Sequence, residues 1–93
     1  MNKNKLKLAR NKVDQLDQRI FNLIKKRTQI VEFMLSLKKF KKEIVDHKRN
    51  NEILKKIRNN SIKNGIDPKI TIRIWKSIIW SYVDFQKRNF KKK

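Results

Sequence analysis

The sequence predicts an all-α protein of three helices: one very long, one short and one of medium length. Glycine and proline occur once each in the 93 residues, both within residues 65–68, so long uninterrupted helices are expected. Apolar residues also recur in alternating steps of three and four, which is helical, heptad-like periodicity. No hairpin signal is present, so strands are not expected. The repeating positions are Val13, Leu16, Ile20, Leu23, Ile30, Met34 and Leu37.

The chain length fits one domain over residues 1–93, and local signals set the helix limits. The first helix is expected from about residue 5 to about residue 41, roughly 55 Å at 1.5 Å per residue. The basic segment 38–43 loses the periodicity and is predicted as a loop. A helix this long cannot be covered by two shorter ones, so a second copy of the chain is expected to pair with it.

The second helix is predicted over residues 47–63 and the third over residues 68–90. Asp46 suits an N-cap, Asn64-Gly65 a left-handed C-terminal stop, and Asp67-Pro68 the start of the last helix. The expected inward positions are Ile53, Leu54, Ile57 and Ile62 on the second helix, and Ile70, Ile74, Trp75, Ile78, Tyr82 and Phe85 on the third.

Composition narrows the function classes. The net charge of +19 favours an anionic partner, although 20 of the 27 basic residues are lysines and this bias also fits an AT-rich genome. Without cysteine, disulfides and thiolate chemistry are excluded, and with one histidine a His-based metal site is not expected. We therefore expect no cofactor and no metal. No apolar run suits a signal peptide or a membrane span, so a cytoplasmic location with no membrane partner is expected.

Three cations stand out on the first helix. Arg27 occupies the apolar stripe between Leu23 and Ile30, where a guanidinium is costly to bury unless an anion pairs with it. Lys38 follows three turns later on nearly the same face, about 16 Å along the axis, which leaves room for a small anion. Arg10 lies about 25 Å before Arg27 and about 100° off its face. Arg10 can therefore approach that region only from a second, antiparallel chain. The alternative is that Arg10 and Lys38 are ordinary solvated residues with no role in a site.

Polar residues on the other helices complete the candidate site. Gln86 follows Tyr82 by four residues on the inward stripe, so its amide must find hydrogen-bond partners, in a ligand site or a structural network. Asp46 and Arg49 begin the second helix and could be no more than a cap and a solvated residue.

Together these positions resemble the all-helical chorismate mutase family. The resemblance covers the chain from Arg10 to Phe90, and no single piece of it is diagnostic. It is carried by the series Arg10-x-x-Val13-x-x-Leu16-Asp17-x-x-Ile20-x-x-Leu23-Ile24-x-x-Arg27, then by Lys38, Asp46-x-x-Arg49, Gly65-Ile66-Asp67-Pro68, Ile78-Ile79 and Gln86.

The resemblance implies an intertwined homodimer that rearranges chorismate to prephenate in aromatic amino acid biosynthesis. It implies that Arg27 and the Arg10 of the neighbouring subunit bind the substrate carboxylates. Lys38 and Gln86 would donate hydrogen bonds to the ether oxygen of the breaking bond. Asp46 and Arg49 would close the site near the ring. A pericyclic reaction of this kind needs positioning and electrostatic stabilisation rather than a nucleophile.

Two departures keep alternatives open. The family commonly has a glutamate after Arg49, whereas this chain has Asn50, a weaker partner for the substrate hydroxyl. Tyr82 replaces a small residue and makes the ending resemble the isochorismate pyruvate lyases, which share the fold and release pyruvate to leave salicylate. Asp46 favours the mutase. A basic helical nucleic-acid-binding protein would explain the charge but not Arg27 and Gln86, so no nucleic-acid partner is expected.

Overall fold

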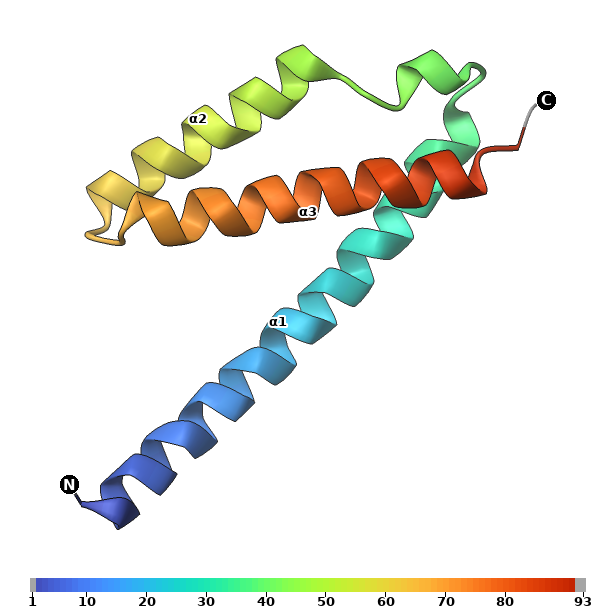
Figure 1. Cartoon of the computed structure of the whole chain (residues 1–93). Coiled ribbons are helices and arrows are strands. Elements are labelled where there is room, and N and C mark those ends of the chain that lie inside the picture. Colours follow the sequence, from blue (N-terminus) through green and yellow to red (C-terminus); the bar gives the residue numbers. More distant parts are fainter. Residues whose placement is uncertain (1, 92–93) are drawn as a thin grey trace. The chain divides into compact units, whose positions relative to one another are not determined.

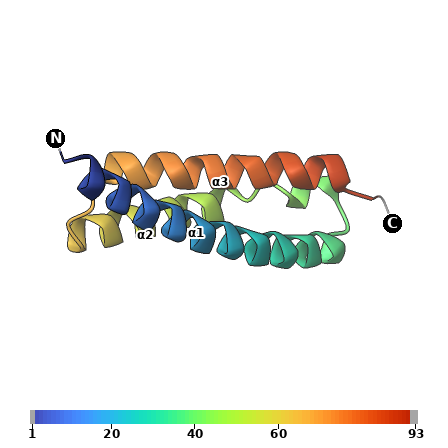
Figure 2. The ribbon, with the colours of Figure 1, turned by 90° about the horizontal axis from the view of Figure 1, so that it is seen from below.

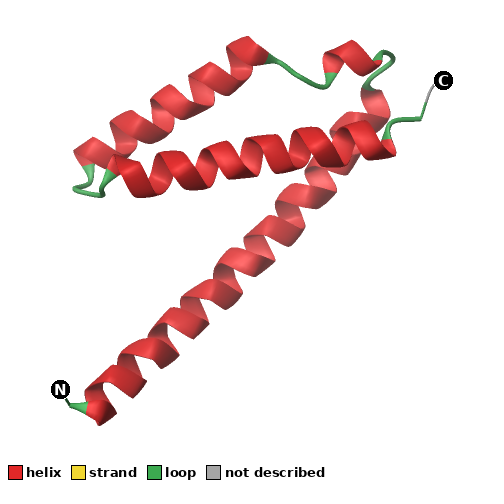
Figure 3. Cartoon of the chain, viewed as in Figure 1, coloured by secondary structure: helices red, strands yellow, loops and turns green. Residues whose placement is uncertain are grey.

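The computed structural model describes residues 2–91, and its regular elements are all helical (Figures 1 and 3). They are α1 (Lys3–Leu37), a short 3-10 turn η1 (Lys41–Glu43), α2 (His47–Lys63) and α3 (Pro68–Asn89). The predicted all-α class with a very long, a short and a medium helix is confirmed. No helix within the described range is both long enough and apolar enough to cross a membrane.

The first helix ends earlier than predicted, at Leu37 instead of about residue 41. The reason is the carboxylate of Glu43. Its Oε2 accepts the backbone N–H groups of Lys39 at 2.8 Å and Phe40 at 3.1 Å. In a continuing helix these N–H groups would donate to carbonyls four residues back. Segment 38–43 leaves α1, as predicted, but only residues 38–40 lack regular structure, because residues 41–43 form the 3-10 turn η1. Lys38 is the first residue after the helix.

The described chain divides into two compact units, with the boundary between Val31 and Glu32 inside α1. The first unit is the helix up to Val31. Its predicted apolar stripe is open to solvent, because Val13, Leu16, Ile20 and Leu23 are 53%, 52%, 56% and 62% exposed. No residue between 2 and 31 covers the stripe.

The second unit is built around a hairpin in which α2 packs against α3 (Figures 1 and 2). Its buried apolar side chains are Ile44, Ile79 and Val83. Most of the predicted inward positions are half-buried: Ile53, Leu54, Ile57, Trp75, Ile78, Tyr82 and Phe85.

Three predicted core positions of the hairpin are wrong. Ile62, Ile70 and Ile74 are 63%, 56% and 47% exposed. Ile62 is the second-to-last residue of α2 and Ile70 lies in the first turn of α3, where the hairpin turn leaves no opposing layer. At this end the buried contact is polar instead, since the hydroxyls of Ser61 and Thr71 lie 2.6 Å apart.

The turn between α2 and α3 follows the predicted capping chemistry. Gly65 has φ of 70°, and Ile66 N–H donates to the Ser61 carbonyl at 2.9 Å while Gly65 N–H donates to the Ile62 carbonyl at 3.3 Å. This pair of bonds is a Schellman motif, which satisfies carbonyls that the helix end leaves open. Asp67 then caps α3 by accepting Lys69 N–H at 2.9 Å.

We expect Gly65→Ala to lower the free energy of unfolding by about 1 kcal/mol, because a side chain is strained at this positive φ. A Cβ at this position would meet nothing within 4 Å, so the loss is backbone strain and not a clash. Urea denaturation followed by circular dichroism measures it. Lys63→Ala, at an exposed helical neighbour, is the control and should change stability little; equal stability of the Gly65 variant would contradict the capping role.

Candidate active site

The second unit joins Lys38 and Gln86, which are 48 residues apart in the sequence. The Lys38 ammonium Nζ donates a hydrogen bond of 2.7 Å to Gln86 Oε1. Lys38 is half-buried and Gln86 is only 7% exposed. Two residues predicted for one site are thus brought together by the fold.

Gln86 is held from both ends of its amide. Its Oε1 accepts from Lys38, and its Nε2 donates to the carbonyl of Tyr82, one turn earlier on α3, at 3.2 Å. Tyr82 packs edge-on against Phe85 with ring centroids 6.4 Å apart. The buried amide therefore has a fixed orientation, in which the nitrogen is its donor end.

This pair keeps donor capacity for a ligand. An ammonium has three N–H groups and the amide nitrogen has two, and each group commits one of them to the bonds just described. No carboxylate within the described residues forms a salt bridge with Lys38. A half-buried cation with spare donors beside a spare amide N–H suits an anionic or electron-rich oxygen.

Glu43 holds the loop that presents Lys38, and the sequence interpretation missed it. Its carboxylate binds the backbone N–H groups of the two residues that directly follow Lys38. The hydrogen bond from Phe40 N–H lowers the pKa of this carboxyl below its ordinary value of 4.5. The Lys39 N–H and the charges of Lys38 and Lys39 lower the pKa further, while desolvation acts in the opposite direction. Glu43 lies three positions after Phe40, but a capping box is recognised in a sequence by Ser or Thr at the first position, so no local pattern revealed this role.

The start of α2 presents the other predicted residues of this unit. Asp46 is an N-cap, as predicted, since its Oδ1 accepts Arg49 N–H at 2.9 Å. The side chains of Asp46 and Arg49 are otherwise exposed. Asn50 is half-buried, and its amide nitrogen is buried without a hydrogen-bond partner in the described chain. A buried N–H donor without a hydrogen-bond acceptor costs free energy, so this nitrogen is suited to donate to an acceptor atom of a ligand.

Arg10 and Arg27 lie on α1 in the first unit. Arg10 is exposed, whereas Arg27 is half-buried on the apolar stripe, as the heptad spacing predicted.

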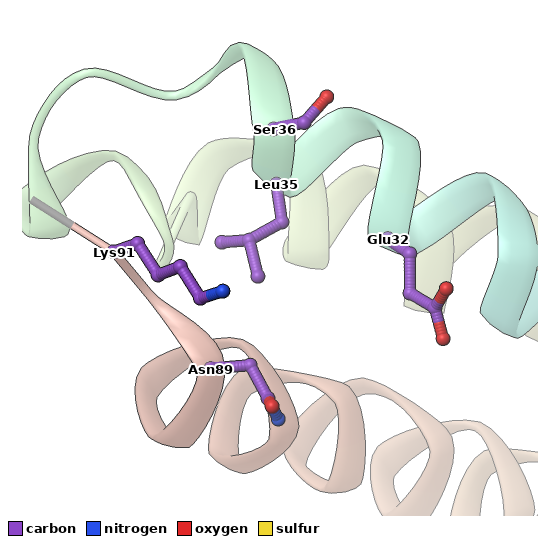
Figure 4. A pocket seen from close by; sticks show the side chains of 5 residues that line it. All are labelled: Glu32, Leu35, Ser36, Asn89 and Lys91. Atoms are coloured by element: carbon purple, nitrogen blue, oxygen red, sulfur yellow. The ribbon is translucent and has the colours of Figure 1, made fainter. Parts of the chain in front are cut away.

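One depression of the second unit lies away from these residues. It has a volume of about 250 Å³ and is lined by none of the predicted site residues (Figure 4). It is formed by the last turns of α1 and the end of α3, with Glu32, Leu35, Ser36, Asn89 and Lys91 around it. The carboxylate of Glu32 in its lining does not suit a dianion. Among residues 2–91, no group of three or more His, Cys, Asp or Glu side chains is placed to hold a metal ion.

The described fold is all-helical and brings an ammonium and an amide together, an arrangement that suits the binding of an anionic or electron-rich oxygen. The model of the family "chorismate mutase type II" matches residues 9–87 of the chain. The chain therefore belongs to this family, and its activity is that of a chorismate mutase, an intramolecular isomerase. No curated protein and no solved structure gives a significant match. The match favours the mutase, and no finding supports the isochorismate pyruvate lyase.

We expect the stabilising effect of Glu43 to depend on pH. The pKa of its carboxyl is lower in the folded protein than its ordinary 4.5, so the ionised form stabilises the fold. That contribution is complete above pH 4.5 and is lost as the pH falls through the lowered folded value. The difference in free energy of unfolding between the wild type and Glu43→Gln should therefore be constant near neutral pH and shrink below pH 4.5.

Urea denaturation at a series of pH values measures this difference. Glu32→Gln is the matched control, because Glu32 accepts no backbone hydrogen bond in the described chain. A Glu43→Gln difference that stays unchanged down to the acid transition would contradict the role assigned to the carboxylate.

Proposed function

We propose that Lys38 and Gln86 are the catalytic pair that acts on the ether oxygen as chorismate rearranges to prephenate. The observation that carries this proposal is the 2.7 Å bond between Lys38 Nζ and Gln86 Oε1. It places one ammonium and one amide at a single point of the fold. Both retain N–H groups for a third partner.

The chemistry explains why such a pair is useful. The rearrangement breaks a carbon–oxygen bond and forms a carbon–carbon bond in one substrate, and negative charge grows on the ether oxygen in the transition state. Donors aimed at this atom stabilise the transition state more than the ground state. The bond from Lys38 to the carbonyl end of Gln86 orients the amide, so its nitrogen is the end left for the substrate.

We further propose that Arg27 and the Arg10 of a second copy bind the two carboxylates. A guanidinium binds a carboxylate bidentately, and chorismate has two carboxylates to hold in a compact conformation. The half-burial of Arg27 on an apolar stripe supports this role, because a partly desolvated guanidinium attracts an anion more strongly than a fully solvated one.

The exposed stripe on α1 supports a homodimer. Apolar side chains that recur every three or four residues and stay about half exposed form a seam that an antiparallel copy of α1 would cover. Such a pairing would also bring Arg10 of one chain toward the site of the other. A two-fold dimer would then have two shared sites.

The start of α2 and residue Tyr82 complete the proposed site. Asn50 has a buried amide nitrogen with no partner in the described chain, which supports a hydrogen bond to the ring hydroxyl of the substrate. Asp46 and Arg49 would close the site over the ring, and Tyr82 would border the substrate beside Gln86. A cytoplasmic location stays a prediction of the sequence.

We expect Lys38→Ala and Gln86→Ala each to lower kcat about 100-fold or more, the usual effect of removing a donor to a developing oxyanion. The change in KM should be smaller, because the carboxylates keep their arginines. Steady-state conversion of chorismate, followed by absorbance, measures both constants. Lys39→Ala removes the neighbouring, exposed lysine and should retain activity. A folded Lys38→Ala variant with the kcat of the wild type would disprove the assignment.

We expect two inactive variants to restore activity when their subunits exchange. In a heterodimer of Arg10→Ala and Lys38→Ala chains, one site lacks both residues and the other retains both. An equal mixture after complete exchange should therefore reach about a quarter of wild-type activity. Light scattering gives the oligomeric state and an affinity tag on one variant verifies exchange. Verified heterodimers without activity would contradict a shared site, even if the protein is a chorismate mutase.

A further inference from the structure

A second group of cations surrounds a depression on the α2–α3 hairpin. The depression has a volume of about 250 Å³, and four of its six lining residues are basic. None of them belongs to the proposed active site. The lining residues are Arg58 on α2 and Pro68, Lys69, Ile72, Arg73 and Lys76 on α3.

The sequence spacing explains why these cations converge. Lys69, Arg73 and Lys76 are related by steps of four and three, so they share one face of α3 over about 10 Å. Packing of α2 against α3 adds Arg58 from the opposite side of the depression. Ile72 and Pro68 are half-buried and contribute the apolar part of the lining.

The four charges are not neutralised within the described chain. No salt bridge or side-chain hydrogen bond involves Arg58, Lys69, Arg73 or Lys76. Asp67, the carboxylate nearest in sequence, accepts the backbone N–H of Lys69 as the cap of α3. Four like charges around one hollow repel one another, and a bound anion would relieve this repulsion.

We propose that this depression is a binding site for a polyphosphate group, with two or more adjacent phosphoryl units. Two phosphoryl groups bring roughly three to four negative charges, which balance four cations, whereas a dicarboxylate brings two. Arginine forks bind phosphate oxygens bidentately and lysines act as point charges. At about 250 Å³ the hollow has room for the phosphates themselves, and the rest of a ligand would extend into solvent.

Titration calorimetry with inorganic triphosphate, at about 0.1 M salt to screen diffuse attraction, tests the proposal on the full chain. The double variant Arg73→Ala with Lys76→Ala should bind about tenfold more weakly or worse. Alanine at these exposed helical positions favours the helix, so the variant should fold, as circular dichroism will verify. Lys5→Ala with Lys7→Ala removes the same charge from α1 and should leave the affinity unchanged.

Three outcomes would overturn the site. The first is no binding of triphosphate to the wild type. The second is an equal loss of affinity in both double variants, which would mean attraction to net charge alone. The third is binding of a single-stranded oligonucleotide without binding of triphosphate. This result would indicate a nucleic-acid surface instead of a polyphosphate site. Succinate serves as the dicarboxylate comparison and should bind more weakly than triphosphate.

Discussion

The hydrogen bond between Lys38 and Gln86 is the interaction on which the proposed active site depends. It ties the loop after α1 to the last turns of α3, and it takes an ammonium and an amide partly or wholly out of water. Such burial costs free energy that an apolar pair would not cost. A contact that is costly for stability is consistent with the proposed role of the pair in binding a substrate oxygen.

The surrounding structure serves to place these two groups. Gln86 is fixed by its own helix through the Tyr82 carbonyl, so its position follows from α3. Lys38 lies one residue beyond the end of α1, where its N–H still donates to the Leu35 carbonyl at 3.1 Å. Its backbone depends on the Glu43 carboxylate, which binds the two N–H groups that follow. One partner is therefore placed by regular secondary structure and the other by a charged loop contact.

The sequence was a good guide where local chemistry decides the structure. The caps at Asp46 and Asp67 and the glycine stop at Gly65 are where the sequence put them, since each depends on neighbouring residues alone. The predictions were wrong where the structure depends on contacts between residues that are distant in the sequence or outside the apolar repeat. The periodicity predicted a first helix that continues beyond Leu37. It could not reveal that the Glu43 carboxylate binds the backbone N–H groups of Lys39 and Phe40.

The same distinction applies to the candidate site. Arg27 and Gln86 were recognisable as polar residues on apolar stripes, and both have reduced exposure in the structure. Glu43 lies on no stripe and was missed. The proposed contribution of Arg10 depends on a second chain, so neither periodicity nor the fold of one chain can place it.

The charge of the long helix limits how two copies could associate. Residues 3–37 carry nine Lys or Arg and three Asp or Glu, a net charge of +6, so two copies of α1 would bring +12 into one seam. The exposed apolar stripe favours association by burying surface, and the charge opposes it. Two substrate dianions bound between Arg27 and Arg10 would offset four of these charges. In the proposed dimer, substrate binding and subunit association would therefore stabilise each other, because an anion that binds only the assembled site shifts the equilibrium toward the assembly.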